Sequence, residues 1–291
     1  MKRRYIREQK TVCGKEYMEI DLFPVSPAEH RASRRAKKQK ASSLAMMNCN
    51  ERYSRRYLVQ LVATNFSRAE GALVLHLTYE DAYLPQTWEQ AERDVTNFVR
   101  RLNRRCRRHG KPKAKWITVT EHQEEDPAGG VREVRYHHHM ILQCELSLDE
   151  IKDAWCTGQG VWKERLGLAK ADRAEFEHGT LEAFCQYITK YPKRKRRWRQ
   201  SQGLKKPEYR PPNDTRYSAR KLDEIARGRI DDKTFWEKQY GKLRTNAGVR
   251  EYEFVEAEAR YNQVDGSWHV IAKMWADPRK QRRKRRSGDQ T

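Results

Sequence analysis

Hydrophobic positions in the middle of the chain follow the periods of both strands and helices. Apolar runs of strand length occupy residues 72–79, 115–121 and 136–142. Residues 87–108 place apolar side chains three and four positions apart, which is the spacing of one helix face. Two neighbouring strands such as the last two runs usually pair antiparallel. The pattern therefore predicts an α+β fold with a central antiparallel sheet, strand 136–142 in its middle, and helices on one face.

The flanking segments add further strands and helices. A strand at 17–23 precedes a helical pattern at 26–64. Residues 216–243 are again helical in pattern, and the Asp265–Gly266 pair is a strong signal for a β-hairpin. We expect five regions: a basic β and helical N-terminal extension at 1–70, the core at 71–192, a basic loop and helical region at 193–249, the β-hairpin at 250–278 and a disordered basic tail at 279–291.

The charge of the chain predicts a polyanionic partner. The sequence holds 62 Lys and Arg against 40 Asp and Glu, a formal net charge of +22. Such an excess favours nucleic acid. A membrane is a less favoured partner, because no apolar run approaches the roughly 20 residues that cross a bilayer. The basic N-terminus is not followed by an apolar signal core, so we expect a cytoplasmic protein.

Two basic clusters are candidate DNA contacts. Residues 193–199 place six Lys and Arg around Trp198, whose ring could stack on a base while the charges follow the backbone. A disordered linker is an equally ordinary interpretation of this segment. The end of the 87–108 helix is also basic, although basic residues suit any helix C-terminus. The candidate DNA-binding residues are Arg194, Lys195, Arg196, Arg197, Trp198, Arg104 and Arg105.

Three consecutive histidines open the apolar run at 136–142. Because side chains alternate along a strand, His137 and His139 share one face and His138 points to the other. Two imidazoles on neighbouring same-face positions can hold a metal ion, although an isolated His-x-His is more often structural. Glu121 ends the preceding strand and is expected beside the histidines as a third ligand. Glu124, Glu125 or His122 could take its place.

A helix that begins after Thr180 carries two tyrosines beside its apolar stripe. Tyr187 and Tyr191 are four residues apart and share a face, with Lys190 beside them. Pro192 ends the helix. Tyrosines that flank an apolar stripe usually serve packing, so this pattern alone is weak.

An acidic residue, a His-x-His strand and a Y-x-x-K-Y helix follow one another, as Glu121, residues 137–139 and residues 187–191. This order resembles the HUH endonuclease superfamily, and within it the rolling-circle replication initiators. The branch that includes the gene II protein of filamentous phages is the most similar, and residues 73–79 look like the first motif of the family. The resemblance covers about 71–192 and implies a ferredoxin-like or RNA-recognition-motif-like core between basic extensions.

The resemblance also implies a chemistry. Glu121, His137 and His139 would hold Mg²⁺ or Mn²⁺ at the scissile phosphate of single-stranded DNA. Tyr187 would attack that phosphate, forming a 5′-phosphotyrosine link and freeing a 3′-OH primer. Lys190 would position the reacting groups or protonate the leaving group.

Tyr191 would take a second transfer, and the pattern leaves open which tyrosine attacks first. The implied partners are single-stranded DNA at a replication origin and the helicase and polymerase of the host, without a membrane. The implied location is the cytoplasm of a bacterial host cell, at the nucleoid.

Other functions share parts of this pattern. A relaxase or a single-strand transposase of the same superfamily would use the same chemistry in a different process. A non-catalytic nucleic-acid-binding protein would use the histidines structurally. A zinc-dependent hydrolase is less favoured, since no further His or Cys ligand stands at motif spacing.

Overall fold

The computed structural model describes residues 4–26, 44–67, 70–125, 131–158, 160–174, 181, 183–185, 197–246, 248–263 and 266–276. The chain divides into two compact units. Arg55–Lys205 forms one, here called the central unit, while Met1–Ser54 and Lys206–Thr291 together form the other, here called the terminal unit. Helix α2 (Leu44–Asn65) runs through the boundary between them.

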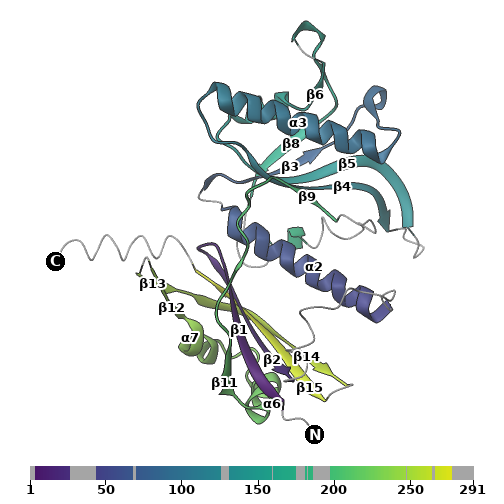
Figure 1. Cartoon of the computed structure of the whole chain (residues 1–291). Helices are drawn as coiled ribbons and strands as arrows, with labels where there is room; N and C mark the ends of the chain where they lie inside the picture. The colour runs from purple at the N-terminus through teal and green to yellow at the C-terminus, as the bar shows by residue number, and fades with distance from the viewer. Residues whose placement is uncertain are drawn as a thin grey trace, which may run out of the picture. The chain divides into compact units, whose positions relative to one another are not determined.

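Five antiparallel strands form the sheet of the central unit, in the order β8-β3-β5-β4-β9 (Figure 1). The strand with the three histidines, β5, is the middle one, as its apolar run predicts. Strand β8 is not predicted, because its short polar sequence gives little strand signal. The bounds are β3 Leu73–Leu77, β4 Lys115–Glu125, β5 Val131–Gln143, β8 Ala169–Arg173 and β9 Arg199–Gln200.

Helix α3 (Trp88–Arg108) packs on one face of this sheet (Figure 1). Thr87 is its N-cap: the hydroxyl of Thr87 accepts a hydrogen bond from the Gln90 amide at 3.2 Å. The apolar stripe of the helix meets one face of β3 and β5 in a shared core. The fully buried members of this core include Leu75, Leu77, Phe98, Leu102, Met140 and Trp155.

A short helix and a small hairpin follow β5. Helix α4 (Leu148–Asp153) begins at Ser147 with a complete capping box to Glu150. After it come β6 (Cys156–Thr157), a 3₁₀ turn η3 (Gly160–Trp162) and β7 (Glu164–Arg165), which pairs antiparallel with β6. A second 3₁₀ turn, η2 (Asp81–Tyr83), follows β3. Figure 1 shows the β6–β7 hairpin extending away from the sheet on the side of α3.

The terminal unit is a second antiparallel sheet, in the order β10-β1-β2-β15-β14, with β11 also paired to β1. Helices α6 (Ala219–Gly228) and α7 (Lys233–Tyr240) share one core with it. The pair β12 (Lys242–Thr245) and β13 (Gly248–Glu251) stands apart from that sheet. The remaining bounds are β1 Tyr5–Cys13, β2 Tyr17–Val25, β10 Glu208–Tyr209, β11 Asn213–Tyr217, β14 Glu253–Asn262 and β15 Ser267–Trp275.

The structure groups the chain differently from the five regions expected from the sequence. The predicted C-terminal hairpin forms, but its strand β15 pairs with β2, so both ends of the chain build one sheet. Local patterns reveal strands and turns, whereas pairing between strands some 250 positions apart leaves no local signal. The predicted tail at 279–291 lies outside the described residues, as does 27–43 of the predicted N-terminal helix. Among the described helices, none combines the length and apolar character that a bilayer crossing requires.

We expect Ser147→Ala to lower the thermal stability of the central unit, because the change removes the hydrogen bond that the serine hydroxyl accepts from the Glu150 amide and the one it donates to the Glu150 carboxylate. An N-cap contributes about 1 kcal/mol, which corresponds to a fall of about 2–4 °C in the midpoint of a unit of this size. Differential scanning calorimetry measures it. Ser147→Asp keeps a capping oxygen and should stay within about 1 °C of the wild type; an equal loss in both variants would contradict the capping role.

Candidate metal centre

Three side chains meet on one face of the central sheet. Strands β4 and β5 pair with Glu121 directly opposite His137, and His139 lies two positions along β5. Glu121 Oε2 lies 3.2 Å from His137 Nε2 and 3.5 Å from His139 Nε2. One ligand atom from each residue falls within 4.8 Å of the others, so the group, here called the triad, could hold a metal ion. The predicted facing of His137 and His139, and the place of Glu121 beside them, are confirmed.

The hydrogen bond on the far side of His137 fixes which nitrogen faces the glutamate. His137 Nδ1 lies 3.0 Å from the carbonyl oxygen of Arg135. A carbonyl only accepts, so Nδ1 donates and the neutral ring presents a lone pair on Nε2. Glu121 Oε2 is also an acceptor. Two acceptors at this distance require a proton or a cation between them, and an imidazole fixed by a carbonyl in this way is the usual environment of a metal-binding histidine.

Glu121 is largely buried beside the two imidazoles. Burial raises the pKa of its carboxyl, but the interactions with the ring nitrogens of His137 and His139 outweigh burial, so the pKa lies below its ordinary value. The carboxylate is therefore ionised at neutral pH. Its second oxygen, Oε1, is buried without a hydrogen-bond partner among the described residues. A buried anionic oxygen without such a partner is costly, and coordination to a cation would offset that cost.

The middle histidine has a structural position on the opposite face. His138 is fully buried in the core under α3, where its ring meets Tyr79 and Trp155 edge to face. Both ring nitrogens are satisfied: Nε2 by the Tyr79 hydroxyl at 2.8 Å and Nδ1 by the Thr120 hydroxyl at 2.9 Å. Burial, with smaller effects from His137 and His139, lowers the pKa of His138 to about 3. His138 is thus a neutral residue that anchors β5.

His122, a candidate third ligand in place of Glu121, lies elsewhere. Its ring stacks on Tyr136 with the ring centres 3.8 Å apart, and its Nε2 lies 3.8 Å from Glu133. An irregular register between Glu121 and Gln123 separates it from the regular pairing at the triad. The side chains of Glu124 and Glu125, which could also replace Glu121, lie outside the described part of the chain.

His76 also belongs to this face, although the sequence pattern predicts no role for it. It pairs with His139 across β3 and β5, and the two ring centres are 4.4 Å apart in an edge-on contact. Burial and the neighbouring His139 and Lys170 lower the pKa of His76. The signal that could have identified His76 is the alternation of buried and less buried positions along 73–77, which is typical of a strand with two different faces. The sequence hides this alternation because the segment is a near-continuous apolar run.

The tyrosine helix is only partly described. Residues 181 and 183–185 are helical, and Leu181 and Cys185 are buried, as the apolar stripe predicts. Six of the predicted site residues lie outside the described part of the chain and stay predictions: Tyr187, Lys190, Tyr191, Arg194, Lys195 and Arg196.

Trp198 lies on the same face of the sheet as the triad. Its indole N–H donates to Gln200 Oε1 at 3.0 Å, and Gln200 pairs with Ile117. Ile117 shares the face of Glu121, four positions along β4. The neighbouring Arg199 points the other way and donates to the Glu92 carbonyl and the Thr96 hydroxyl of α3. Trp198 and Arg197 are both half-buried.

The two α3 candidates differ in their surroundings. Arg105 pairs with Asp153 at 2.7 Å and donates to the Glu150 carbonyl, so it ties α3 to α4. Arg104 is exposed. The prediction that both contact DNA stays a prediction, and the structure gives Arg105 an internal role in addition.

Comparison with known proteins supports the family resemblance. Residues 72–196 match the family model of the replication-associated protein ORF2/gene II protein family. The matched segment lies within the central unit and contains the whole triad. A search of curated proteins and a search of solved structures each found no significant match. The resemblance to replication initiators of the gene II type is thereby confirmed for this segment.

We expect Glu121→Ala, His137→Ala and His139→Ala each to lower the affinity for Mn²⁺ at least about tenfold, because each removes one ligand of the triad. Electron paramagnetic resonance of free Mn²⁺ during a titration measures this. His122→Ala is the matched control on the same strand and should bind Mn²⁺ as the wild type does. A loss in His122→Ala with none in Glu121→Ala would make His122 the third ligand.

The buried His138 predicts a stability that falls with acid. The unfolded chain takes up a proton near pH 6.5, while folded His138 stays neutral down to about pH 3. Between these values the unfolded state binds more protons, so the group costs about 1.4 kcal/mol per pH unit as the pH falls. Urea unfolding with chelator at pH 7.5 and 5.5 measures the loss. In His138→Gln the loss of unfolding free energy between the two pH values should be smaller by about 1.4 kcal/mol. If the loss is unchanged in this variant, it comes from other titrating groups.

Proposed function

We propose that this protein is a metal-dependent, site-specific endonuclease and ligase for single-stranded DNA that initiates rolling-circle replication. The observation that carries the proposal is the triad of Glu121, His137 and His139 on the two middle strands of the segment that matches replication-associated proteins. The net charge of +22 supports a nucleic-acid substrate.

In this proposal the triad residues would hold and orient a divalent metal ion. His137 is fixed by the Arg135 carbonyl, His139 is buried, and Glu121 is ionised between them. Two imidazoles and one carboxylate suit Mn²⁺ well and the harder Mg²⁺ less so. When bound, such an ion polarises the scissile phosphate and offsets the charge that develops on it.

Tyr187 supplies the nucleophile. Its phenolic oxygen gives up its proton to solvent and bonds to phosphorus as the bond from phosphorus to the 3′ oxygen breaks, and the 3′ oxygen takes up one proton in return to become the free 3′-OH. The 5′-phosphotyrosine link keeps the energy of the phosphodiester for later rejoining. Lys190, one helical turn away, positions the phosphate or protonates the leaving oxygen. Tyr191 takes a second transfer, which closes one product strand while the next is held.

Single-stranded DNA fits the triad face. Trp198 stands on that face and is followed by Arg199, which anchors it to α3, so a base can stack on an indole whose backbone is fixed. The preceding basic residues of 193–197 would follow the strand. The freed 3′-OH would serve a host polymerase, with a host helicase opening the duplex.

A relaxase or single-strand transposase would use the same chemistry, and a non-catalytic nucleic-acid-binding protein belongs to another class. The close approach of three metal-ligand atoms in the triad favours the enzyme over the binding protein. Purely structural histidines resemble His138, which is buried, neutral and hydrogen-bonded on both nitrogens.

We expect Tyr187→Phe to abolish the covalent DNA adduct, because the change removes only the nucleophilic oxygen. Single-stranded DNA from the intergenic region of the parent element, labelled at either end, is incubated with protein and Mn²⁺ and run on a denaturing gel. The wild type should give a downstream fragment linked to the protein through its 5′ phosphate and an upstream fragment with a free 3′-OH. Tyr191→Phe should keep the first cleavage and lose the second transfer.

The same gel separates the competing functions. An adduct that survives Tyr187→Phe and disappears in Tyr191→Phe would exchange the roles of the two tyrosines. Binding without cleavage by the wild type, with every divalent ion and on several candidate origins, would refute the enzyme and favour the binding protein.

A further inference from the structure

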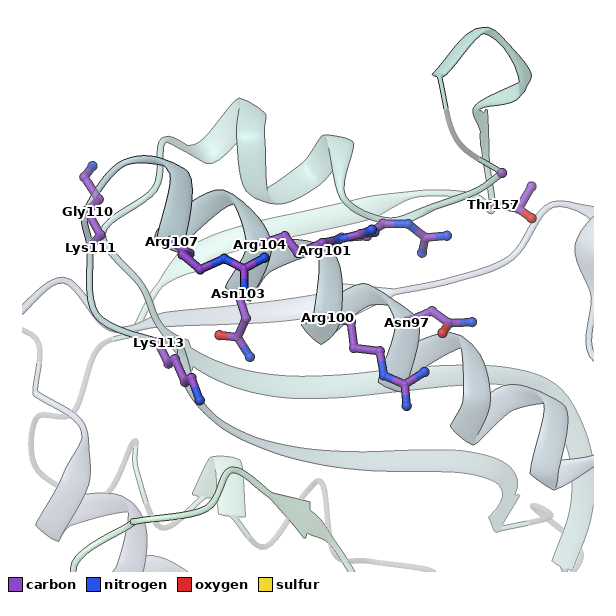
Figure 2. Close-up of a pocket in the computed structure, with 11 residues that line it drawn as sticks. Asn97, Arg100, Arg101, Asn103, Arg104, Arg107, Gly110, Lys111, Lys113 and Thr157 are labelled. Atoms are coloured by element: carbon purple, nitrogen blue, oxygen red, sulfur yellow. The ribbon is translucent and has the colours of Figure 1, made fainter.

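The outer side of α3 carries a concentrated positive surface. A depression of about 1040 Å³ runs over the C-terminal half of the helix and the segment after it (Figure 2). Figure 2 shows that its side chains come mainly from α3, with Lys111 and Lys113 from the following segment and Thr157 from β6. We call this surface the basic groove and define it by Arg100, Arg101, Arg104, Arg107, Lys111 and Lys113.

The sequence of α3 forces these arginines outward. The buried positions of the helix include Val95, Phe98, Val99, Leu102 and Cys106. Arginines at 100, 104 and 107 fall between them at helical spacing and are exposed. From Asn97 to Arg108 the helix rises about 16 Å, enough to face about five phosphates of one strand of a DNA duplex.

The positive charge of the groove is largely uncompensated. The nearby acids already have partners: Asp153 pairs with Arg105 and Lys163, and Glu150 pairs with His109. Among the ion pairs of the described residues, none involves Arg100, Arg104 or Arg107. An exposed row of arginines without paired acids attracts a polyanion strongly.

The lining chemistry points to the backbone of a duplex. The described residues that line the groove carry guanidinium and ammonium groups, two asparagines, a threonine and glycines, and none of them is aromatic. Surfaces for single strands interleave aromatic rings with charges, because unpaired bases need a stacking partner. A surface of cationic and small polar side chains contacts phosphates and sugars, which is how proteins hold a duplex without reading its sequence.

An exposed aromatic residue, Trp162, lies on a turn whose residues Gly160 and Lys163 line a hollow next to this groove. This hollow of about 200 Å³ continues from the groove and is lined by α3 arginines and by Gly158, Gly160 and Lys163 of the β6–β7 hairpin. On the same turn Trp162 is 81% and Val161 92% exposed. Gly158 has φ +67°, and a Cβ there would lie 2.0 Å from the Trp162 carbonyl oxygen, so a glycine is needed to hold this turn. Apolar tips beside phosphate-binding surfaces serve other proteins as wedges against base pairs.

We propose that the basic groove and the Trp162 turn form a second DNA-binding surface that holds a duplex, on the side of the sheet opposite the triad. The two sides are separate because α3 packs on the face of His138, whereas Glu121, His137 and His139 lie on the other. The groove binds the phosphates, and Trp162 contacts a base pair. The inference depends on the proposed function only because it takes DNA as the polyanion. It does not depend on cleavage, since a duplex can be bound without being cut.

The test is duplex binding without metal. A labelled duplex of about 24 base pairs and arbitrary sequence is titrated with full-length protein in chelator, by fluorescence anisotropy at several salt concentrations. The groove variant is Arg100→Gln/Arg107→Gln/Lys113→Gln. The control is Arg220→Gln/Lys233→Gln/Lys238→Gln, which removes the same charge from exposed positions of α6 and α7. A single strand of about 12 thymidines is titrated in parallel.

We expect the duplex affinity of the groove variant to fall at least about tenfold. The slope of log affinity against log salt concentration should become shallower by about 2.7, because three charges are removed. The control should lose less than about twofold. Trp162→Ala should lose about fivefold or more with an unchanged salt dependence, because a stacking contact releases no counterions. Leu168→Ala, an exposed apolar residue outside the groove lining, is its control and should bind as the wild type does.

Several results would overturn the inference. If the groove variant and its control lose duplex affinity equally, the basic groove is not a DNA-binding surface. If the groove variant loses as much affinity for the single strand as for the duplex, the groove does not hold a duplex specifically. An unchanged Trp162→Ala would remove the wedge. If the triple variant unfolds, Arg100→Gln and Arg107→Gln are measured singly, each with a slope change of about 0.9. A protein that behaves as expected here and never nicks DNA would refute the proposed function and leave this inference standing.

Discussion

The register between β4 and β5 is the constraint on which the site depends. It places Glu121 opposite His137, and because side chains alternate, it sets His139 on the same face and His138 on the other. A slip by one residue would exchange the faces, moving His138 to Glu121 and sending the other two histidines into the core. The apolar residues after the histidines oppose that slip, since Met140 and Leu142 belong to the core under α3.

The two faces of β5 have complementary tasks. On the α3 side, His138 is held by the hydroxyls of Tyr79 and Thr120, in a packed core that allows the strand little freedom. On the other side, the imidazoles of His137 and His139 inherit that rigidity. A metal site needs ligands held to a fraction of an ångström, and strands in the middle of a sheet provide this better than loops do. The histidine in the middle position thus supports the candidate site without entering it.

The sequence was sufficient for what is local and insufficient for what is distant. Helix α3 with its Thr87 cap, the histidine strand and the facing of its residues all follow from spacing within a few positions. The pairing of β15 with β2 joins segments at opposite ends of the chain, and only the folded core decides it. The sequence does not reveal the place of His76 for a different reason. A strand of five residues with one histidine between leucines has the pattern of an apolar run, and only the contact with the His139 ring shows which face His76 occupies.

The sequence also does not show which basic residues are free to contact a partner. Arg104 and Arg105 are neighbours in one basic run, and the net charge counts them alike. In the structure, Arg105 lies against Asp153 and joins two helices, whereas Arg104 opens to the basic groove. What separates them is the turn of about 100° per residue along the helix, which places one beside α4 and the other over open solvent. The helix that closes the core behind His138 is therefore also the helix that carries the groove, and the groove and the triad are held apart by one layer of packed side chains and one sheet.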